Sequence, residues 1–372
     1  MSILPLADFW QPLAQAWQDD LGWQVPWHFG DWQREYKAAL SCAAVLDISH
    51  RTTLLLTGRD RTPFLHNFCT NDIVRLRVGS GCEAFLTTAQ AKVLAWFHAF
   101  VEEQAIVLDA DPGRAPVILQ HLSRYLISED VAFEDLTGRV AVLHVSGPIA
   151  ADKLAKILPG ANWPSEEHGH VALLKDGHLI RVRRLSRWGQ PGWDLVTDPM
   201  TARRCVQEML QEGVAPIGYA AAEVLRIEAG WPVFGRDLDE THLPQEIGRD
   251  AQAISFTKGC YLGQETVARI RAYGHVNRQL CGLRLSTSEV LASGTRLLPT
   301  GSMSASAGQP QEIGRITSCV YSPRCRGVIA LAWLRRGYWQ PGTTVLAETP
   351  TGRVGATVSS LPFVAATPSS PS

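Results

Sequence analysis

The chain has 372 residues, of which 45% are hydrophobic and 19% are charged, and its formal net charge at pH 7 is -1. This composition is typical of a globular protein with about two or three domains. A nearly neutral chain has no electrostatic field that would attract nucleic acid or an acidic membrane surface. No apolar run approaches the roughly 20 residues that a membrane-spanning helix needs, so we expect neither nucleic acid nor a membrane as a partner.

The N-terminal segment contains Asp8, Asp19 and Asp20 and has no Lys or Arg before Arg34. A secretory signal begins with positive charge, and a mitochondrial transit peptide is rich in Arg, so the expected compartment is the cytoplasm. The eight cysteines include no Cys-x-x-Cys pair. The sequence therefore predicts no metal site, and we expect the thiols to be reduced.

The first part of the chain is expected to mix helices and strands. Leu13, Ala16 and Trp17 share helical spacing and predict an amphipathic helix. Alternating apolar residues around Phe85 and Trp96 predict a β-hairpin with one buried face. The expected helices are 34–40, 61–67 and 116–125, and the expected strands are 45–50, 52–57, 82–87, 93–101 and 106–110.

A strand–glycine–helix unit occurs twice. Gly58 follows the first strand of this kind, Gly147 follows a second strand at 140–146, and a predicted helix comes after each glycine. A glycine lets the chain turn sharply at the end of a strand. The repetition indicates two related α+β halves, and no glycine-rich phosphate-binding pattern accompanies either copy.

The later elements change in character along the chain. His168 and His170 lie in a polar segment without a third metal ligand, so we expect a solvated loop there. After residue 278, short strands alternate with Gly and Pro, which is the pattern of a small β-barrel or sandwich. The expected helices are 201–211, 220–229 and 264–272, and the expected strands are 179–185, 279–285, 314–318, 327–334, 343–348 and 353–361.

The segment Phe-Thr-Lys-Gly-Cys-Tyr-Leu-Gly-Gln-Glu, residues 256–265, contains the main candidate for chemistry. We expect Gly259 and Gly263 to bracket a path that a residue with a Cβ would resist. Cys260 would then lie just before a helix N-terminus, with Lys258 on the same side of the chain. A nearby cation and a helix start both lower a thiol pKa. From the residues alone, the alternative is a small apolar cysteine packed under a loop, with Lys258 solvated.

The motif Lys-Gly-Cys-Tyr-Leu-Gly-Gln-Glu resembles the signature of the YgfZ family of folate-binding proteins. That family belongs to the larger group of the glycine-cleavage T-protein, an aminomethyltransferase that uses tetrahydrofolate. The resemblance implies an α+β fold with two interleaved T-protein-type subdomains and a C-terminal antiparallel β-barrel. The domains expected on this basis are a folate-binding domain at 1–273 with 53–139 as an inserted subdomain, a barrel at 274–364 and a disordered tail at 365–372.

The second hairpin strand departs from the transferases of this group. Its sequence resembles theirs, but Ala95 and Trp96 stand where they have a pair of aspartates, one of which acts on the folate amine. Neither side chain can accept a proton or hold a cationic amine. YgfZ-like proteins have lost the carboxylate in the same way, so the resemblance argues against an ordinary aminomethyltransferase.

The resemblance also implies which residues line a pocket for tetrahydrofolate or a one-carbon derivative. Asn71 belongs to a Thr-Asn-Asp tripeptide that the T-protein group shares, and Trp96 would line the pocket from the hairpin. Gln190 stands where the transferases have a glutamate that binds the pterin ring, and Arg226 matches an arginine that helps to anchor folate. From the residues alone, an Asx turn at Asn71 and an ordinary ion pair at Arg226 are the alternatives.

The function that the resemblance implies is that of a tetrahydrofolate-binding accessory protein for iron–sulfur cluster assembly or repair. Cys260 and Lys258 would be its reactive residues, and iron–sulfur assembly or client proteins would be its partners. The alternative is a tetrahydrofolate-dependent aminomethyltransferase or demethylating transferase, in which Asp72 or Asp109 substitutes for the missing carboxylate. A protein-interaction module with an empty cavity is a third hypothesis.

Overall fold

The computed structural model describes residues 1–160, 162–300 and 311–365. These residues form two compact units, which we call the N-terminal unit (residues 1–222 and 251–264) and the barrel unit (residues 223–250 and 265–365). The domain boundary expected from the sequence at 273/274 stays a prediction. From residue 366 onward, the predicted disordered tail lies outside the described residues.

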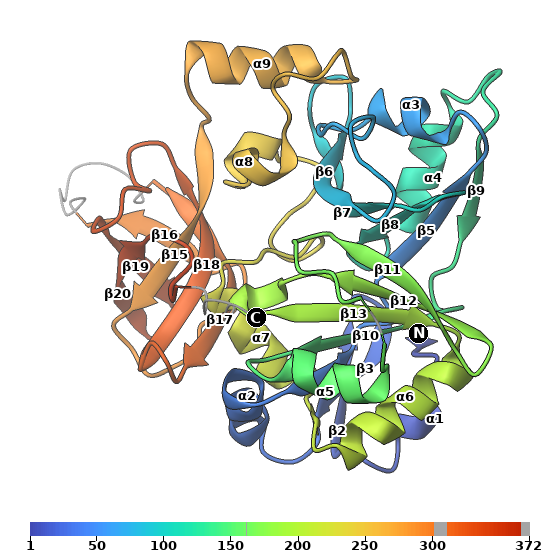
Figure 1. Ribbon diagram of the computed structural model, residues 1–372. Coiled ribbons are helices and arrows are strands. Elements are labelled where there is room, and N and C mark those ends of the chain that lie inside the picture. The colour runs from blue at the N-terminus through green and yellow to red at the C-terminus, as the bar shows by residue number, and fades with distance from the viewer. Residues whose placement is uncertain (161, 301–310, 366–372) are drawn as a thin grey trace. The chain divides into compact units, whose positions relative to one another are not determined.

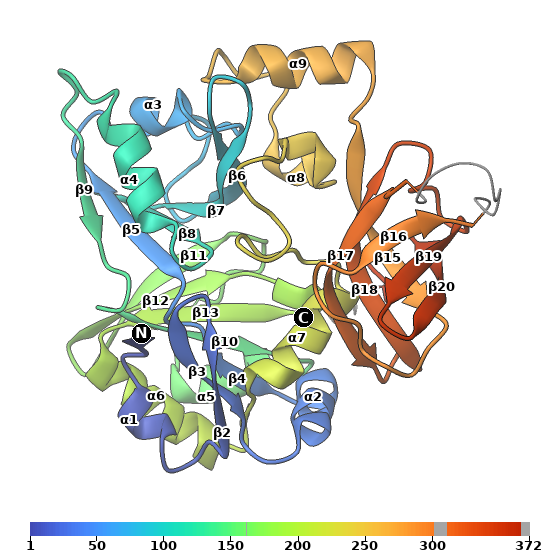
Figure 2. The ribbon, with the colours of Figure 1, turned by 180° about the vertical axis from the view of Figure 1, so that it is seen from behind.

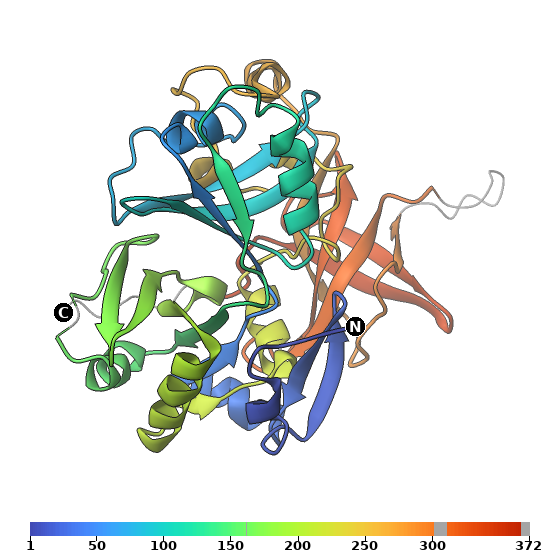
Figure 3. The same cartoon turned by 90° about the vertical axis from the view of Figure 1, so that its right-hand side faces the viewer.

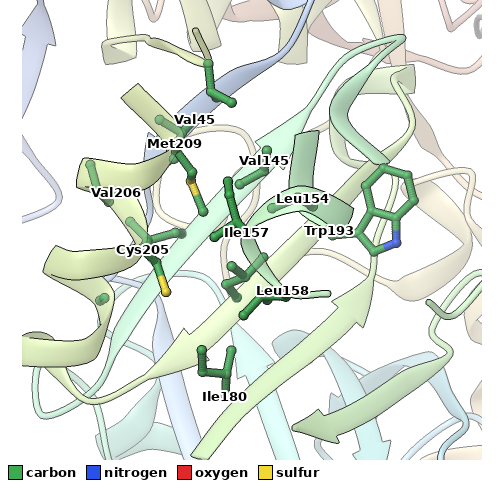
Figure 4. Packing of buried hydrophobic residues seen from close by; sticks show 14 of the residues in the cluster. Val45, Val145, Leu154, Ile157, Leu158, Ile180, Trp193, Cys205, Val206 and Met209 are labelled. Atoms are coloured by element: carbon green, nitrogen blue, oxygen red, sulfur yellow. The ribbon is translucent and has the colours of Figure 1, made fainter. Parts of the chain in front are cut away.

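The larger sheet of the N-terminal unit has six strands, and two helices cover one of its faces (Figure 1). These helices are α5 (Ala150–Ile157) and α6 (Pro199–Gln211), and Figure 4 shows the apolar core that they form with the sheet. The strands in spatial order are β11 (His170–Lys175), β12 (His178–Arg184), β13 (Gly192–Thr197), β10 (Ala141–Ser146), β4 (Ala44–Asp47) and β14 (Ala215–Pro216).

A second, five-stranded sheet of the N-terminal unit contains the predicted hairpin. Helix α4 (Ala115–Ser123) packs against this sheet (Figure 3), and α3 (Arg61–His66) follows its strand β5. The strands in spatial order are β6 (Gly81–Thr87), β7 (Val93–Val101), β8 (Ile106–Ala110), β5 (Thr52–Thr57) and β9 (Ala132–Asp135). The hairpin of β6 and β7 is confirmed, and its register places Glu83 opposite His98.

The two repeated glycines occupy equivalent positions after β5 and β10. Gly58 has a φ of +98° and Gly147 a φ of +123°, both in a region that residues with a Cβ rarely adopt. A Cβ would lie 2.1 Å from Asp130 O at Gly58 and 2.3 Å from Cys42 O at Gly147. Both glycines therefore allow the turn that the repeat predicted, and they also permit a close approach of backbone that it did not predict.

The N-terminal segment differs from its prediction, because no amphipathic helix covers Leu13 to Trp17. The chain there forms β1 (Ser2–Ile3), the short helix α1 (Ala7–Trp10), and an antiparallel pair of β2 (Ala16–Asp20) and β3 (Trp23–His28). Leu21 and Gly22 both have positive φ between these two strands, as a tight hairpin turn requires. The predicted helix that follows is confirmed as α2 (Trp32–Ser41).

The barrel unit contains a closed barrel of six antiparallel strands, seen from behind in Figure 2. The strands in order around the barrel are β15 (Arg278–Leu285), β18 (Gly327–Arg335), β17 (Gly314–Ser322), β16 (Arg296–Pro299), β19 (Thr344–Thr349) and β20 (Gly352–Ser359). The predicted fold class, mixed α+β followed by an antiparallel β-barrel, is therefore confirmed.

The remaining helices lie near the points where the chain passes between the units. They are α7 (Tyr219–Glu228), α8 (Asp250–Ala253) and α9 (Gln264–Tyr273). The predicted helices at 220–229 and 264–272 are confirmed by α7 and α9. Among all the helices in the described ranges, none is both long and apolar enough to cross a membrane.

Candidate functional site

The segment with the Lys-Gly-Cys motif follows helix α8, and we call residues 251–263, which include the end of that helix, the thiol loop. Hydrogen bonds hold both of its ends against the part of the N-terminal unit that contains the five-stranded sheet, residues 52–135, which we call the hairpin subdomain. At the start, Thr70 Oγ1 donates to Ala253 O at 2.6 Å, and Ser255 N donates to Thr70 O at 2.9 Å. At the end, Thr87 Oγ1 donates to Leu262 O at 2.9 Å. Thr70 and Thr87 thus position a loop that lies far along the sequence.

The two glycines of the motif behave differently. Gly263 has a φ of +91°, and a Cβ on it would lie 2.6 Å from both Thr87 Oγ1 and Thr88 O. Gly259 does not have such a φ, and an added Cβ would meet nothing within 4 Å. The expected close path is therefore confirmed at Gly263 and wrong at Gly259.

Lys258 is buried, and its ammonium group lies among three backbone carbonyl oxygens. Lys258 Nζ donates to His66 O at 2.5 Å, to Cys69 O at 2.7 Å and to Asn71 O at 2.9 Å. An ammonium has three N–H donors, so all of them are used. Burial lowers the pKa of Lys258 below its ordinary value. The solvated lysine of the alternative hypothesis is thus not what the structure contains.

Cys260 lies two residues after Lys258 and is exposed. It precedes α9, as predicted, but the intervening Tyr261 to Gly263 separates the thiol from the first turn of that helix. The Lys258 ammonium has no N–H left to donate to a thiolate at this position. The thiol is therefore accessible, and the Lys258 ammonium, which the spacing placed on the same side of the chain, uses its hydrogen bonds on backbone carbonyls.

Asn71 has a structural position between the thiol loop and the hairpin. Its Nδ2 donates to Glu83 O at 2.7 Å and to Gln252 O at 2.9 Å, and its Oδ1 accepts from Asp72 N at 2.9 Å. Both N–H donors of the amide are therefore engaged by the protein. This arrangement makes Asn71 a connector between two segments of the N-terminal unit.

Ala95 and Trp96 both lie on β7 and are buried, with 0% and 3% of their surface exposed. Trp96 Nε1 donates a hydrogen bond to Glu83 Oε1 at 2.9 Å. Glu83 is itself buried on the neighbouring strand β6. The two positions that the resemblance singled out thus carry buried apolar side chains. The carboxylate that contacts Trp96 is that of Glu83, on the neighbouring strand β6.

A chain of buried ion pairs runs between the two sheets of the N-terminal unit. Arg51 donates to Asp109 and to Asp111, each at 2.7 Å at the shortest contact. Arg187 Nη2 donates to Asp109 Oδ1 at 3.0 Å and to Asp194 Oδ2 at 2.7 Å. Sequence reasoning missed this cluster, because its members are scattered along the chain and no local pattern links them.

Asp109 was one of the two residues considered as a replacement base. Burial raises the pKa of Asp109, but the positive charges of Arg187 and Arg51 outweigh that effect and hold the pKa well below its ordinary value. A carboxylate with such a low pKa is a poor proton acceptor at neutral pH. Asp109 is therefore an ion-pair partner of Arg51 and Arg187 and a poor candidate for a base.

The same chain of ion pairs anchors the turn that contains Gln190. Asp194 Oδ1 lies 2.7 Å from His144 Nδ1, and burial lowers the pKa of His144 although the Asp194 carboxylate opposes that effect. His144 lies beneath Gly192, where an added Cβ would be only 2.6 Å from its ring. Gln190 is buried within this turn, at 2% exposure.

Arg226 lies in the barrel unit, and protein atoms accept all five of its N–H donors. Nε and Nη2 donate to the two carboxylate oxygens of Glu223 at 2.6 and 2.7 Å. The remaining donors bind Asp237 Oδ2 at 3.0 Å, Trp231 O at 3.3 Å and Ser318 Oγ at 2.7 Å. The guanidinium thus connects α7 to the barrel strand β17.

The two histidines of the expected solvated loop are partly buried and make specific contacts. His168 Nε2 lies 3.0 Å from His98 Nδ1, and His170, the first residue of β11, has its Nε2 3.1 Å from Val101 O. The expectation of a solvated loop is therefore wrong for this pair. Across the described residues, no group of three His, Cys, Asp or Glu side chains is arranged to hold a metal ion.

Comparison with known families decides the classification. Residues 6–258 match the GCVT N-terminal domain, and residues 278–365 match the glycine cleavage T-protein C-terminal barrel domain. The chain belongs to the glycine-cleavage T-protein family.

Relatives within the T-protein family cover most of this chain. A chloroplastic protein of Arabidopsis thaliana that carries a provisional transferase name is 30% identical over 86% of this chain and 71% of its own length. An aminomethyltransferase of Chlorobium luteolum is 26% identical over 92% of this chain and 93% of its own length. The crystal structure of the glycine cleavage system aminomethyltransferase T from Bartonella henselae has a TM-score of 0.85 at 22% identity, over 98% of both chains, and this likeness concerns the fold.

Proposed function

We propose that this T-protein family member is a tetrahydrofolate-binding accessory protein of the YgfZ type, which supports the assembly or repair of iron–sulfur enzymes in the cytoplasm. The observation that carries the proposal is the buried apolar pair Ala95 and Trp96 on β7, at the two positions where the resemblance places the aspartates of the transferases. A buried methyl group and an indole cannot take a proton from a folate amine. Folate binding without aminomethyl transfer is the function that this substitution favours.

The thiol loop supports the second half of the proposal. Cys260 is exposed, whereas flanking parts of its loop are fixed by hydrogen bonds to the hairpin subdomain. An exposed thiol on a fixed loop can meet a partner protein in a defined orientation. We propose that Cys260 is the residue through which iron–sulfur assembly or client proteins are contacted.

The alternative of a working aminomethyltransferase or demethylating transferase has support from the relatives that carry that name. It requires another carboxylate to act as the base. Asp109 is held between two guanidinium groups, which leaves Asp72 from the pair of candidates. Asp72 Oδ1 lies 3.5 Å from His66 Nδ1, and its Oδ2 lies 3.3 Å from Arg75 Nε.

Two assays on the same purified protein separate these functions. We expect no turnover of an aminomethylated lipoyl carrier or of dimethylglycine in the presence of tetrahydrofolate, whereas sustained turnover abolished by Asp72→Asn would establish the transferase. In a host that lacks the gene, we expect the wild-type chain to restore iron–sulfur enzyme activity under oxidative stress. Cys260→Ala should fail to do so, while Cys42→Ala, which removes another exposed thiol, should succeed. Full restoration by Cys260→Ala would remove the thiol from the proposal.

A further inference from the structure

We infer that Lys258 is a positioning residue, whose ammonium group acts as a built-in cation that binds three carbonyl oxygens and fixes the thiol loop onto the segment 66–71. This role differs from the acidification of Cys260 that the spacing of the two residues suggests. This attachment, which we call the clamp, is a property of the free protein, and its importance for a partner rests on the proposed function.

The three carbonyls come from one short stretch of chain, at and just after the end of α3. His66 is the last residue of that helix, so its carbonyl has no intrahelical donor, and Cys69 and Asn71 follow in the next turn of the chain. Carbonyl oxygens at a helix C-terminus carry partial negative charge and favour a cation. Lys258 donates to all three carbonyls from a position 187 to 192 residues away in sequence, and Asn71 O accepts from Cys69 Sγ as well.

Further contacts show that the clamp is one part of a built attachment. Lys258 N donates to Ser255 Oγ at 3.2 Å, and Leu262 N donates to Asn67 O at 3.0 Å. Tyr261 is buried, and its ring centroid lies 4.9 Å from Lys258 Nζ. Cys260 lies between these fixed points and remains exposed. The loop is therefore attached on both sides of the thiol, with the ammonium as the charged attachment on one side.

Asn71 gives the clamp a second connection to the hairpin. Its carbonyl accepts from Lys258 Nζ, while its side-chain amide donates to Gln252 O and Glu83 O. The side chain of Lys258 thus binds the segment 66–71 from the thiol loop, and the side chain of Asn71 binds the thiol loop from the segment 66–71. Loss of Lys258 should loosen the thiol loop even when the hairpin subdomain stays folded.

The clamp and the acidification role predict different results for the alkylation of Cys260 and for amide exchange in the thiol loop. If the ammonium lowered the thiol pKa, its removal would raise the midpoint of the pH–rate profile for alkylation. If the ammonium only holds the loop, the midpoint stays in place and the backbone of the loop exchanges its amide hydrogens faster. Arginine separates the two roles further, because it keeps the charge but cannot place a compact ammonium among three converging carbonyls.

The experiment uses the full chain with Cys42→Ser, so that a reagent for exposed thiols reports on Cys260. Iodoacetamide alkylation across pH and hydrogen exchange of residues 251–263 are measured for Lys258, Lys258→Ala and Lys258→Arg. Lys37→Ala, at an exposed lysine, is the matched control. We expect the alkylation midpoint to stay within about 0.3 pH units in both Lys258 variants, and exchange in the loop to rise roughly tenfold or more. The control should change neither quantity.

Chemical rescue gives the clamp its most specific test. Ethylammonium chloride should slow exchange in the thiol loop of Lys258→Ala, because a free ammonium ion can occupy the carbonyls, whereas sodium chloride at equal ionic strength should not. If Lys258→Ala does not fold, Lys258→Arg carries the same two measurements. The acidification role predicts that the alkylation midpoint rises by about one pH unit in Lys258→Ala and stays in place in Lys258→Arg. That result, with unchanged amide exchange of the thiol loop in both variants, would overturn the inference. Unchanged exchange together with an unchanged midpoint would overturn it too. None of these readouts uses folate or a partner, so failure of the clamp and failure of the proposed function are told apart.

Discussion

Arg187 and Asp109 form an ion pair of 3.0 Å that joins the two sheets of the N-terminal unit. Arg187 lies in the turn that contains Gln190, and Asp109 lies on β8, next to the hairpin strand with Trp96. Both side chains are almost fully buried, at 2% and 0% exposure. The turn, to which the resemblance assigns a pterin contact, is therefore connected to the sheet that contains the hairpin by charges shielded from solvent.

Removal of the Asp109 carboxylate should strongly destabilise the protein. Asp109→Asn leaves the guanidinium groups of Arg51 and Arg187 buried without the charge that both of them share. Breaking a buried ion pair on one side costs about 3–5 kcal/mol. Urea unfolding at pH 7 should show a loss of that size, whereas Asp152→Asn, at an exposed position, should change the free energy of unfolding by less than about 0.5 kcal/mol.

The effect of Asp109 should depend on pH in a defined direction. Its pKa in the folded protein lies well below the ordinary value, which is about 3.9 in an unfolded chain. The unfolded state therefore binds the proton first, so the stability that the carboxylate contributes is complete above about pH 4 and is lost as the pH falls toward the folded pKa. The difference in unfolding free energy between wild type and Asp109→Asn should be constant from about pH 7 to 5 and should shrink below about pH 4. A difference that grows on acidification would contradict this assignment.

The two glycines of the motif should respond differently to alanine. Gly263→Ala puts a Cβ 2.6 Å from Thr87 Oγ1 and Thr88 O at a positive φ, and we expect a loss of about 2 kcal/mol or more, with faster exchange in the thiol loop. Gly259→Ala meets no atom within 4 Å and should cost less than about 0.5 kcal/mol. Thermal unfolding and hydrogen exchange of the two variants check the contrast, and equal effects would show that the loop does not pack as described.

Replacement of Arg226 by lysine should weaken the barrel unit. Lysine keeps the charge but supplies three donors in place of five, so it cannot satisfy Glu223, Asp237 and Ser318 together. We expect Arg226→Lys to lose about 2–4 kcal/mol of stability in chemical unfolding. Arg335→Lys, at an exposed arginine of β18, is the control and should be neutral. An Arg226→Lys variant as stable as this control would indicate that the hydrogen bonds of Arg226 contribute little.

The sequence predicted those parts of the fold that depend on local patterns. Five of the six barrel strands, the β6–β7 hairpin and the turns at Gly58 and Gly147 follow from alternation and from glycine positions, whereas the short strand β16 was not predicted. The strands β2 and β3 were missed, because the spacing of Leu13, Ala16 and Trp17 fits a helix and only the turn at Leu21 and Gly22 reveals a hairpin.

The sequence singled out the residues of the candidate site, whose functional roles stay predictions, but it did not reveal their contacts. Cys260 is exposed, as a reactive thiol requires. Ala95 and Trp96 are buried on β7. The partners of Lys258 and the ion pairs of Asp109 depend on residues far away along the chain, which no local spacing encodes. These contacts depend on the tertiary arrangement of the strands and loops, which brings the distant residues together.

Titration of the purified protein with tetrahydrofolate, followed by calorimetry under anaerobic conditions, tests the central claim most directly. The account predicts saturable binding with one ligand per chain, because the chain has both domains of the T-protein family. On the resemblance, Ala95 and Trp96 of β7 replace only the transferase aspartates. Absence of saturable binding up to millimolar ligand would contradict it.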